Sequence, residues 1–198
     1  HEQRRHRHLA HEAHELVWNR ERRRQLGAER EREIEAVGSH LGHERLGEAA
    51  LVRLREVLGV TCFIAIMGNM GPTILRFEEP GLPVTINVRA GSVLPILWSA
   101  TGQVFLSFMD DPNLTRQAQE EYVRAAPEQR AWLGQDQPVE SLRKAGREQG
   151  CASIRDILLN GIGAVAAPIF DHTGKVCAVL TALGAAAGFD TRPHGKIA

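Results

Sequence analysis

The chain has 198 residues, of which 43% are hydrophobic and 24% are charged, and its 24 basic and 24 acidic side chains cancel to a formal net charge of zero. This length predicts one domain, or one domain with an appendage, that is large enough to bury a core. The charge balance excludes a general attraction to nucleic acid or anionic membrane, and no apolar run reaches the roughly 18 residues that a membrane span needs.

Residues 1–37 are rich in Arg, Glu and His and contain no Pro, so they predict a long, charged, solvated helix. A thin apolar stripe at helical spacing indicates that this helix packs against a partner, for example a second copy of itself. The stripe consists of Leu9, Ala13, Leu16 and Val17. We expect residues 1–40 to form a linker or partner helix, separate from a domain that spans residues 41–198.

Two other readings of this segment are weaker. His8, His11 and His14 recur every three residues, but the sequence is HExH rather than the HExxH that places two zinc ligands and a base, so no metal site is predicted. A basic run at residues 20–24 is diluted by glutamates, which disfavours phosphate binding.

An α/β pattern begins near residue 41. Residues 46–60 carry apolar side chains at helical spacing, including Leu54, Val57 and Leu58, and Gly59 ends this predicted helix. Residues 61–81 read as strand, Gly-rich turn and strand, and residues 84–92 as a third short strand. The first half of the domain is therefore predicted to be one helix followed by three strands.

The second half is predicted to hold helices and then a hairpin. Residues 94–109 form a helix of small residues after Pro95, and residues 111–125 and 138–150 form two polar helices. Two apolar strands flank a short polar stretch within residues 161–184. The order of elements predicts an α+β domain, in which helices pack on one or both faces of a largely antiparallel sheet.

The polar stretch Asp171-His172-Thr173-Gly174 raises the possibility of catalysis, but turn chemistry explains it better. An Asp at the start of a turn accepts hydrogen bonds from backbone N–H groups, and a Gly at its end adopts positive φ. No nucleotide-binding, hydrolase or metalloprotease motif occurs elsewhere. The three cysteines, Cys62, Cys151 and Cys177, form no CxxC pair, and we expect small buried side chains in a reducing cytoplasm.

Two blocks resemble the effector-binding domain of IclR-type bacterial transcriptional regulators. They are "RAGSVLPILWSATGQVFLSF" and, some sixty residues later, "GIGAVAAPIFDHTGKVCAVLTALG". The resemblance covers about residues 41–198. It implies a GAF-like fold, a small-molecule pocket on one face of the sheet, and dimers that assemble into tetramers. It also implies a winged helix-turn-helix for DNA, for which residues 1–40 are too short and too charged, and a final helix beyond the end of this sequence.

The resemblance also implies which residues contact the effector. Matched by position, together with a tryptophan that departs from the family pattern, they are Ile86, Trp98, Ala100, Thr101, Ile154, Ile162, Ala164, Thr181 and Leu183. Leu97 and Trp98 replace the usual His-Ala, and the Asp, Cys and two Ser of a carboxylate-binding regulator are absent from this set. We therefore expect an apolar or aromatic effector, with two threonines as polar handles. The alternative is that these side chains only fill the core.

Three functions remain open at this point. The first is a non-enzymatic effector sensor of a cytoplasmic DNA-binding regulator, without a cofactor and without contact to a membrane, which signals through a homodimer or tetramer. The second is an assembly protein that uses the N-terminal helix. The third is a GAF-like cysteine enzyme, which would need paired, exposed cysteines of low pKa.

Overall fold

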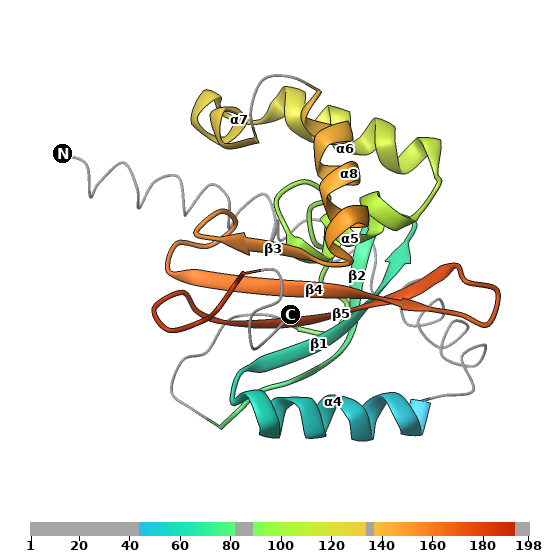
Figure 1. Cartoon of the computed structure of the whole chain (residues 1–198), viewed down its shortest axis with the longest axis vertical. Coiled ribbons are helices and arrows are strands. Elements are labelled where there is room, and N and C mark those ends of the chain that lie inside the picture. The colour runs from blue at the N-terminus through green and yellow to red at the C-terminus, as the bar shows by residue number, and fades with distance from the viewer. Residues whose placement is uncertain (1–43, 82–88, 134–136, 193–198) are drawn as a thin grey trace.

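The computed structural model describes residues 44–81, 89–133 and 137–192. Its centre is a sheet of five antiparallel strands in the order β2-β1-β5-β4-β3, with helices on both faces (Figure 1). The strands are β1 (Thr61–Gly68), β2 (Gly71–Glu78), β3 (Ala152–Arg155), β4 (Ile162–Phe170) and β5 (Val176–Ala185). The expected α+β class is confirmed, and both faces of the sheet are covered.

Helix α4 (Glu44–Leu58) packs on one face of the sheet, at the bottom of Figure 1. Leu51 is its fully buried residue and joins Cys62, Val165 and Ala182 in a small core. The predicted end at Gly59 is confirmed, since this residue has a φ of 64°. The predicted apolar face was partly wrong, because Val57 is 74% exposed and Leu51 was not among the residues expected on it.

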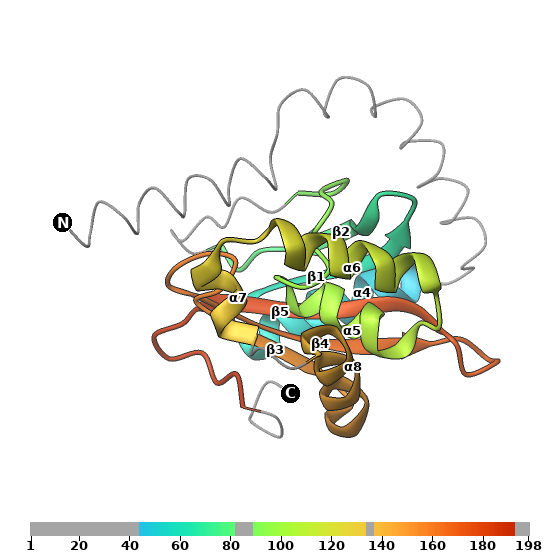
Figure 2. The ribbon, with the colours of Figure 1, turned by 90° about the horizontal axis from the view of Figure 1, so that it is seen from above.

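The opposite face is covered by α5 (Ala100–Phe108), α6 (Pro112–Arg124), α7 (Pro127–Leu133) and α8 (Pro138–Gln149), as Figures 1 and 2 show. The hydroxyl of Ser99 accepts a hydrogen bond from Gly102 N and caps α5, and Asp111 caps α6 in the same way through Asn113 N. Helix α5 therefore begins at Ala100, later than the predicted residue 94. The sequence pattern had indicated neither α7 nor β3.

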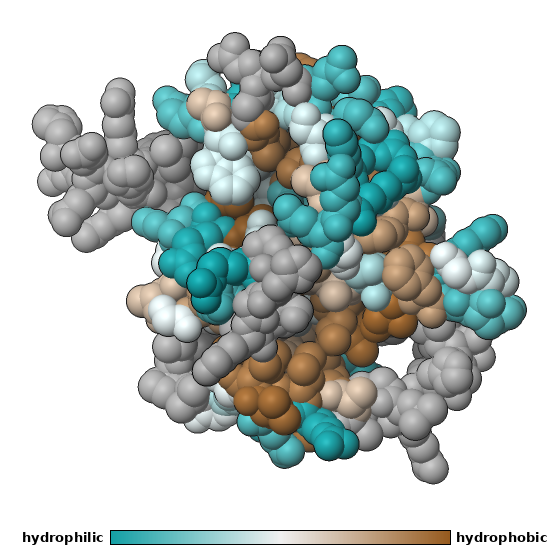
Figure 3. Space-filling view, viewed as in Figure 1, coloured by the Kyte–Doolittle hydropathy of each residue, from teal (hydrophilic) through white to brown (hydrophobic). Residues whose placement is uncertain are grey.

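A large core lies between the sheet and these four helices. Its most buried side chains include Ala65, Ile74, Val104, Phe105 and Val179. Helices α5 and α8 approach closely because Gly146 lies against Ser107, where an added Cβ would overlap the serine hydroxyl. Figure 3 shows that hydrophobic residues gather in the lower half of this view, over the sheet and α4, while the upper helices present a mostly hydrophilic surface.

The turn at residues 171–174 has the predicted form. The Asp171 carboxylate accepts hydrogen bonds from Thr173 N, from the Thr173 hydroxyl and from Lys175 N, and Gly174 has a φ of 78°. The bond from the Thr173 hydroxyl is the main cause that lowers the pKa of Asp171 below its usual value. This carboxylate holds a hairpin turn.

Some predictions fall outside the described residues. These are the charged N-terminal helix with its histidines and most of the third strand, including Ile86. After that strand, residue Val93 forms an isolated antiparallel bridge with Thr73 of β2. No helix in the part of the chain that the structure describes is long and apolar enough to cross a membrane.

Candidate functional site

Three of the expected effector contacts form a row across the sheet. Ile154 of β3 pairs with Ala164 of β4, and Ala164 pairs with Leu183 of β5. Directly paired residues of neighbouring strands project to the same face, so all three point to the side covered by α5. Each of them is buried in the large core.

The two threonines of the expected site meet in space although they are 80 residues apart. The Thr101 hydroxyl on α5 lies 2.8 Å from the Thr181 hydroxyl on β5, and either oxygen can donate. Both side chains are only 1% exposed. Because one shared hydrogen bond uses only one of the two hydroxyl protons, the second proton of the pair is not used by this bond.

The remaining expected contacts belong to, or pack against, the same large core. Trp98 and Ala100 are buried at the start of α5, and Ile162 at the start of β4 is half-buried and packs against the same core. Of the nine residues, eight therefore converge on one side of the sheet, and Ile86 lies outside the described residues. All of these eight side chains except Ile162 are buried, so they also form part of the core.

Residues 95–99, which we call the α5 entry segment, are folded into a tight turn. The Ser99 hydroxyl donates to Pro95 O at 2.6 Å, and the Gln103 amide donates to Leu97 O at 2.8 Å. Gly102 lies directly under this turn, where an added Cβ would overlap the carbonyl oxygens of Pro95 and Ile96. The segment thus fixes the position of Trp98 near its C-terminal end and the start of α5, which carries Thr101.

Sequence reasoning missed one charged residue that contacts this segment. Glu121 of α6 accepts hydrogen bonds from the backbone N–H groups of Ile96 and Leu97, both at 2.9 Å. Burial raises the pKa of Glu121, although the two backbone hydrogen bonds and the charge of Arg124 act in the opposite direction. Its position in the sequence carried a signal, because Leu114, Ala118 and Glu121 share the inward face of α6.

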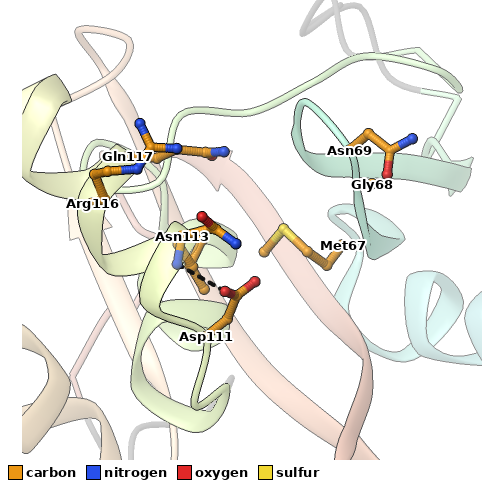
Figure 4. A pocket seen from close by; sticks show the side chains of 8 residues that line it. Met67, Gly68, Asn69, Asp111, Asn113, Arg116 and Gln117 are labelled. Carbon is orange, nitrogen blue, oxygen red and sulfur yellow. Dashed lines mark hydrogen bonds between the residues drawn. The ribbon is translucent and has the colours of Figure 1, made fainter.

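An open hollow of about 350 Å³ lies elsewhere, between the β1–β2 turn and the first turns of α6 (Figure 4). Its lining is mostly polar and consists of Met67, Gly68, Asn69, Asp111, Asn113, Leu114, Arg116 and Gln117. None of the expected effector contacts is among these residues. The carboxylate of Asp111 is engaged by Asn113 N as the cap of α6, so its role in the hollow is explained by helix capping.

The cysteines do not form a reactive pair within the described residues. All three thiols are free, and burial raises the pKa of each of them, to about 11 for Cys62. A raised pKa leaves little thiolate at neutral pH, and thiolate is the nucleophilic form. The described residues also include no cluster of three His, Cys, Asp or Glu side chains that could hold a metal ion.

Comparison with known proteins identifies one family of bacterial regulators. Residues 43–194 match the model of the C-terminal domain of the bacterial transcriptional regulator IclR. The structure of HmgR from Pseudomonas aeruginosa is similar with a TM-score of 0.69 and 34% sequence identity, over 87% of this chain and 67% of that chain. Comparison with the curated proteins gave no match.

Two further solved structures are similar. An IclR transcriptional regulator from Alicyclobacillus acidocaldarius has a TM-score of 0.59 and 25% identity, over 72% of this chain and 56% of that chain. The IclR of Thermotoga maritima has a TM-score of 0.61 and 20% identity, over 80% and 65% of the two chains, which supports the fold alone. The chain thus spans between 56% and 67% of the length of these three relatives.

Proposed function

The chain belongs to the IclR family of bacterial transcriptional regulators, and from that premise we propose that its described domain senses a small-molecule effector between α5 and the sheet. In this proposal the domain is not an enzyme and needs no cofactor. The protein works in the cytoplasm, and a winged helix-turn-helix domain, which we do not assign to any residue here, carries the DNA contact.

The observation that carries this proposal is the buried pair of threonine hydroxyls. Buried hydroxyl groups need hydrogen-bond partners, and the bond between Thr101 and Thr181 leaves one O–H group that it does not use, beside buried apolar side chains. An effector with an apolar or aromatic body and one acceptor oxygen would satisfy this group. Trp98, in the same core, offers an aromatic surface for stacking.

The same residues fill the core, so an effector must enter by displacing part of it. The α5 entry segment is the part of this wall that lies outside the strands, and its hydrogen bonds to Gly102 and Gln103 join it to α5, so we propose that it moves together with the start of that helix. Binding would select a state in which this segment has moved away from β5. In a homodimer or tetramer, that state would change how the attached DNA-binding domains reach their half-sites.

The experiment that tests this function is a thermal shift screen of the full chain with phenol, benzoate, pyruvate and glyoxylate. A ligand that binds only the folded state stabilises it by about 2.7 kcal/mol at a concentration of one hundred times its Kd. We expect phenol to raise the melting temperature more than the small oxoacids do. Tight binding of pyruvate or glyoxylate without a response to phenol would overturn the preference for an aromatic effector.

Two single variants locate the binding site. We expect Thr181→Val to weaken the response to phenol, since it removes a hydroxyl from the pair, while His172→Ala at the exposed hairpin tip leaves the response unchanged. Equal losses from both variants would place the site at the hairpin tip and not between α5 and β5.

A further inference from the structure

Two backbone N–H groups of the α5 entry segment donate hydrogen bonds to one carboxylate of another helix, α6. Pro95 has no N–H group, and the next two N–H groups along the chain, those of Ile96 and Leu97, both donate to Glu121. The two side chains are 2% and 0% exposed, so these amides lie at a dry part of the core. An ionised acceptor in such a place makes stronger bonds than a neutral one.

Glu121 reaches this position because of where it lies on α6. The inward face of α6 is otherwise apolar, with Leu114 and Ala118 buried against the core. The neighbouring Glu120 points outward, where it pairs with Arg116 and Arg124 on the exposed surface. Two consecutive glutamates thus have different environments, and only Glu121 contacts the entry segment.

The other end of α6 is tied to a different element. The Thr115 hydroxyl near its start accepts a hydrogen bond from Arg143 of α8, and Arg143 also binds Asp110 just before α6. Helix α6 is therefore fixed to α8 near its N-terminal end and to the α5 entry segment near its C-terminal end. A displacement of the entry segment would act on α6 through Glu121.

We propose that Glu121 is a positioning residue of the effector site, which holds the α5 entry segment against the core and transmits its movement to α6. This inference rests on the proposed function, because that function identifies the site. The two hydrogen bonds between Glu121 and the segment can nevertheless be measured without any effector. An effector that displaces the segment must either break both hydrogen bonds to Glu121 or pull Glu121 with the segment. In the second case, α6 shifts when the effector binds.

The first test measures amide hydrogen exchange by NMR in the full chain, with Glu121→Gln and the matched control Glu120→Gln. A glutamine side chain has one carbonyl oxygen, and its NH₂ group cannot accept, so one of the two amides loses its partner. We expect exchange at Ile96 or Leu97 to accelerate at least about tenfold in Glu121→Gln, with Ala65 and Val179 of the sheet unchanged. The control should leave all four amides unchanged.

Two outcomes would overturn the proposal. One is unchanged exchange at both Ile96 and Leu97 in Glu121→Gln. The other is an equal acceleration at these amides and in the sheet, which would mean that the variant lowers global stability and that Glu121 has no specific hold on the segment.

The second test follows the amide shifts of Ile96 and Leu97 against pH, a readout that a merely structural role would not move. Because burial raises the pKa of Glu121, we expect a step in both shifts at a pH above the usual range of a glutamate. The step should vanish in Glu121→Gln and persist in Glu120→Gln. A step that persists in Glu121→Gln would assign the titration to another group and overturn the proposal.

A phenol titration separates this inference from the proposed function. If phenol binds the wild-type chain, Glu121→Gln should change its affinity at least about fivefold, while Glu120→Gln should not; an unchanged affinity in Glu121→Gln would overturn the coupling. If phenol does not bind the wild-type chain, the preference for an aromatic effector fails, and the exchange and pH results still decide whether Glu121 holds the entry segment.

Discussion

At individual residues of this protein, the type of side chain alone does not predict its role, because the role depends on burial and on hydrogen-bond partners. Asp171 and His172 look catalytic in the sequence, but Asp171 is fully engaged in a hairpin turn. Thr101 and Thr181 carry no catalytic motif and were expected only as polar contacts for an effector, and they share a hydrogen bond inside the core. The difference is burial, because an unpaired hydroxyl costs free energy only where water cannot reach it.

The threonine pair leads to a prediction on stability. Thr181→Val removes one partner and leaves the Thr101 hydroxyl buried without a hydrogen bond, which we expect to lower the free energy of unfolding by about 1–3 kcal/mol. The double variant Thr101→Val/Thr181→Val replaces both hydroxyls by methyl groups and should recover much of this loss. Urea unfolding of the single and double variants measures the coupling. Strictly additive losses would contradict the pairing.

At the scale of elements, the start of α5 depends on close approach between backbones. Gly102 lies where any Cβ would overlap the carbonyl oxygens of Pro95 and Ile96, and these atoms are backbone and cannot rotate away. The helix can therefore begin at Ala100 only with a glycine two residues later. In the same turn, the N–H groups of Ile96 and Leu97 donate hydrogen bonds to Glu121, so packing and hydrogen bonding at this site depend on each other.

We expect Gly102→Ala to destabilise the fold by about 1–3 kcal/mol or more, since the entry segment must shift to make room. The matched control is Gly81→Ala, because no atom of the described residues lies within 4 Å of a Cβ added at Gly81, and its φ is not positive. This control should stay within about 0.5 kcal/mol of wild type. Urea unfolding compares the two, and similar midpoints would show that the turn accommodates a methyl group without strain.

At the scale of the whole molecule, the sheet separates two cores of unequal size. The large core under α5, α6 and α8 contains the candidate site, and the small core under α4 contains Cys62 and Phe189. Both cores are built from residues 51–189, so the described domain carries its own hydrophobic stabilisation. We therefore expect the proposed sensor to fold without residues 1–37.

A truncation tests this separation. We expect residues 38–198 to unfold cooperatively and to give the same rise in melting temperature with phenol as the full chain, because the site and both cores remain. Analytical ultracentrifugation of the two chains then reports what residues 1–37 contribute to assembly. A shortened chain that unfolds normally but no longer responds to phenol would assign the N-terminal segment to the effector site.

Much of the local structure could be predicted from the sequence, although α7, β3 and the start of α5 could not. Alternating side chains in β1 and β5, the Pro residues that open α6 and α8, and the turn at residues 171–174 depend on neighbours in the chain, so their patterns were sufficient. The order of elements predicted the α+β class, and the resemblance between two sequence blocks and a known family added the GAF-like fold and a set of site residues, eight of which lie on one side of the sheet.

Local sequence patterns could not predict which distant residues meet, because these contacts depend on how the elements pack. The choice of Leu51 over Val57 as the buried residue of α4 depends on how the helix is rotated against the sheet, and helical spacing alone does not set this rotation. The row from Ile154 to Leu183 depends on strand register, and the two bonds of Glu121 join residues about 25 positions apart. Such pairings are fixed by packing across the whole core, so a local pattern carries little information about them.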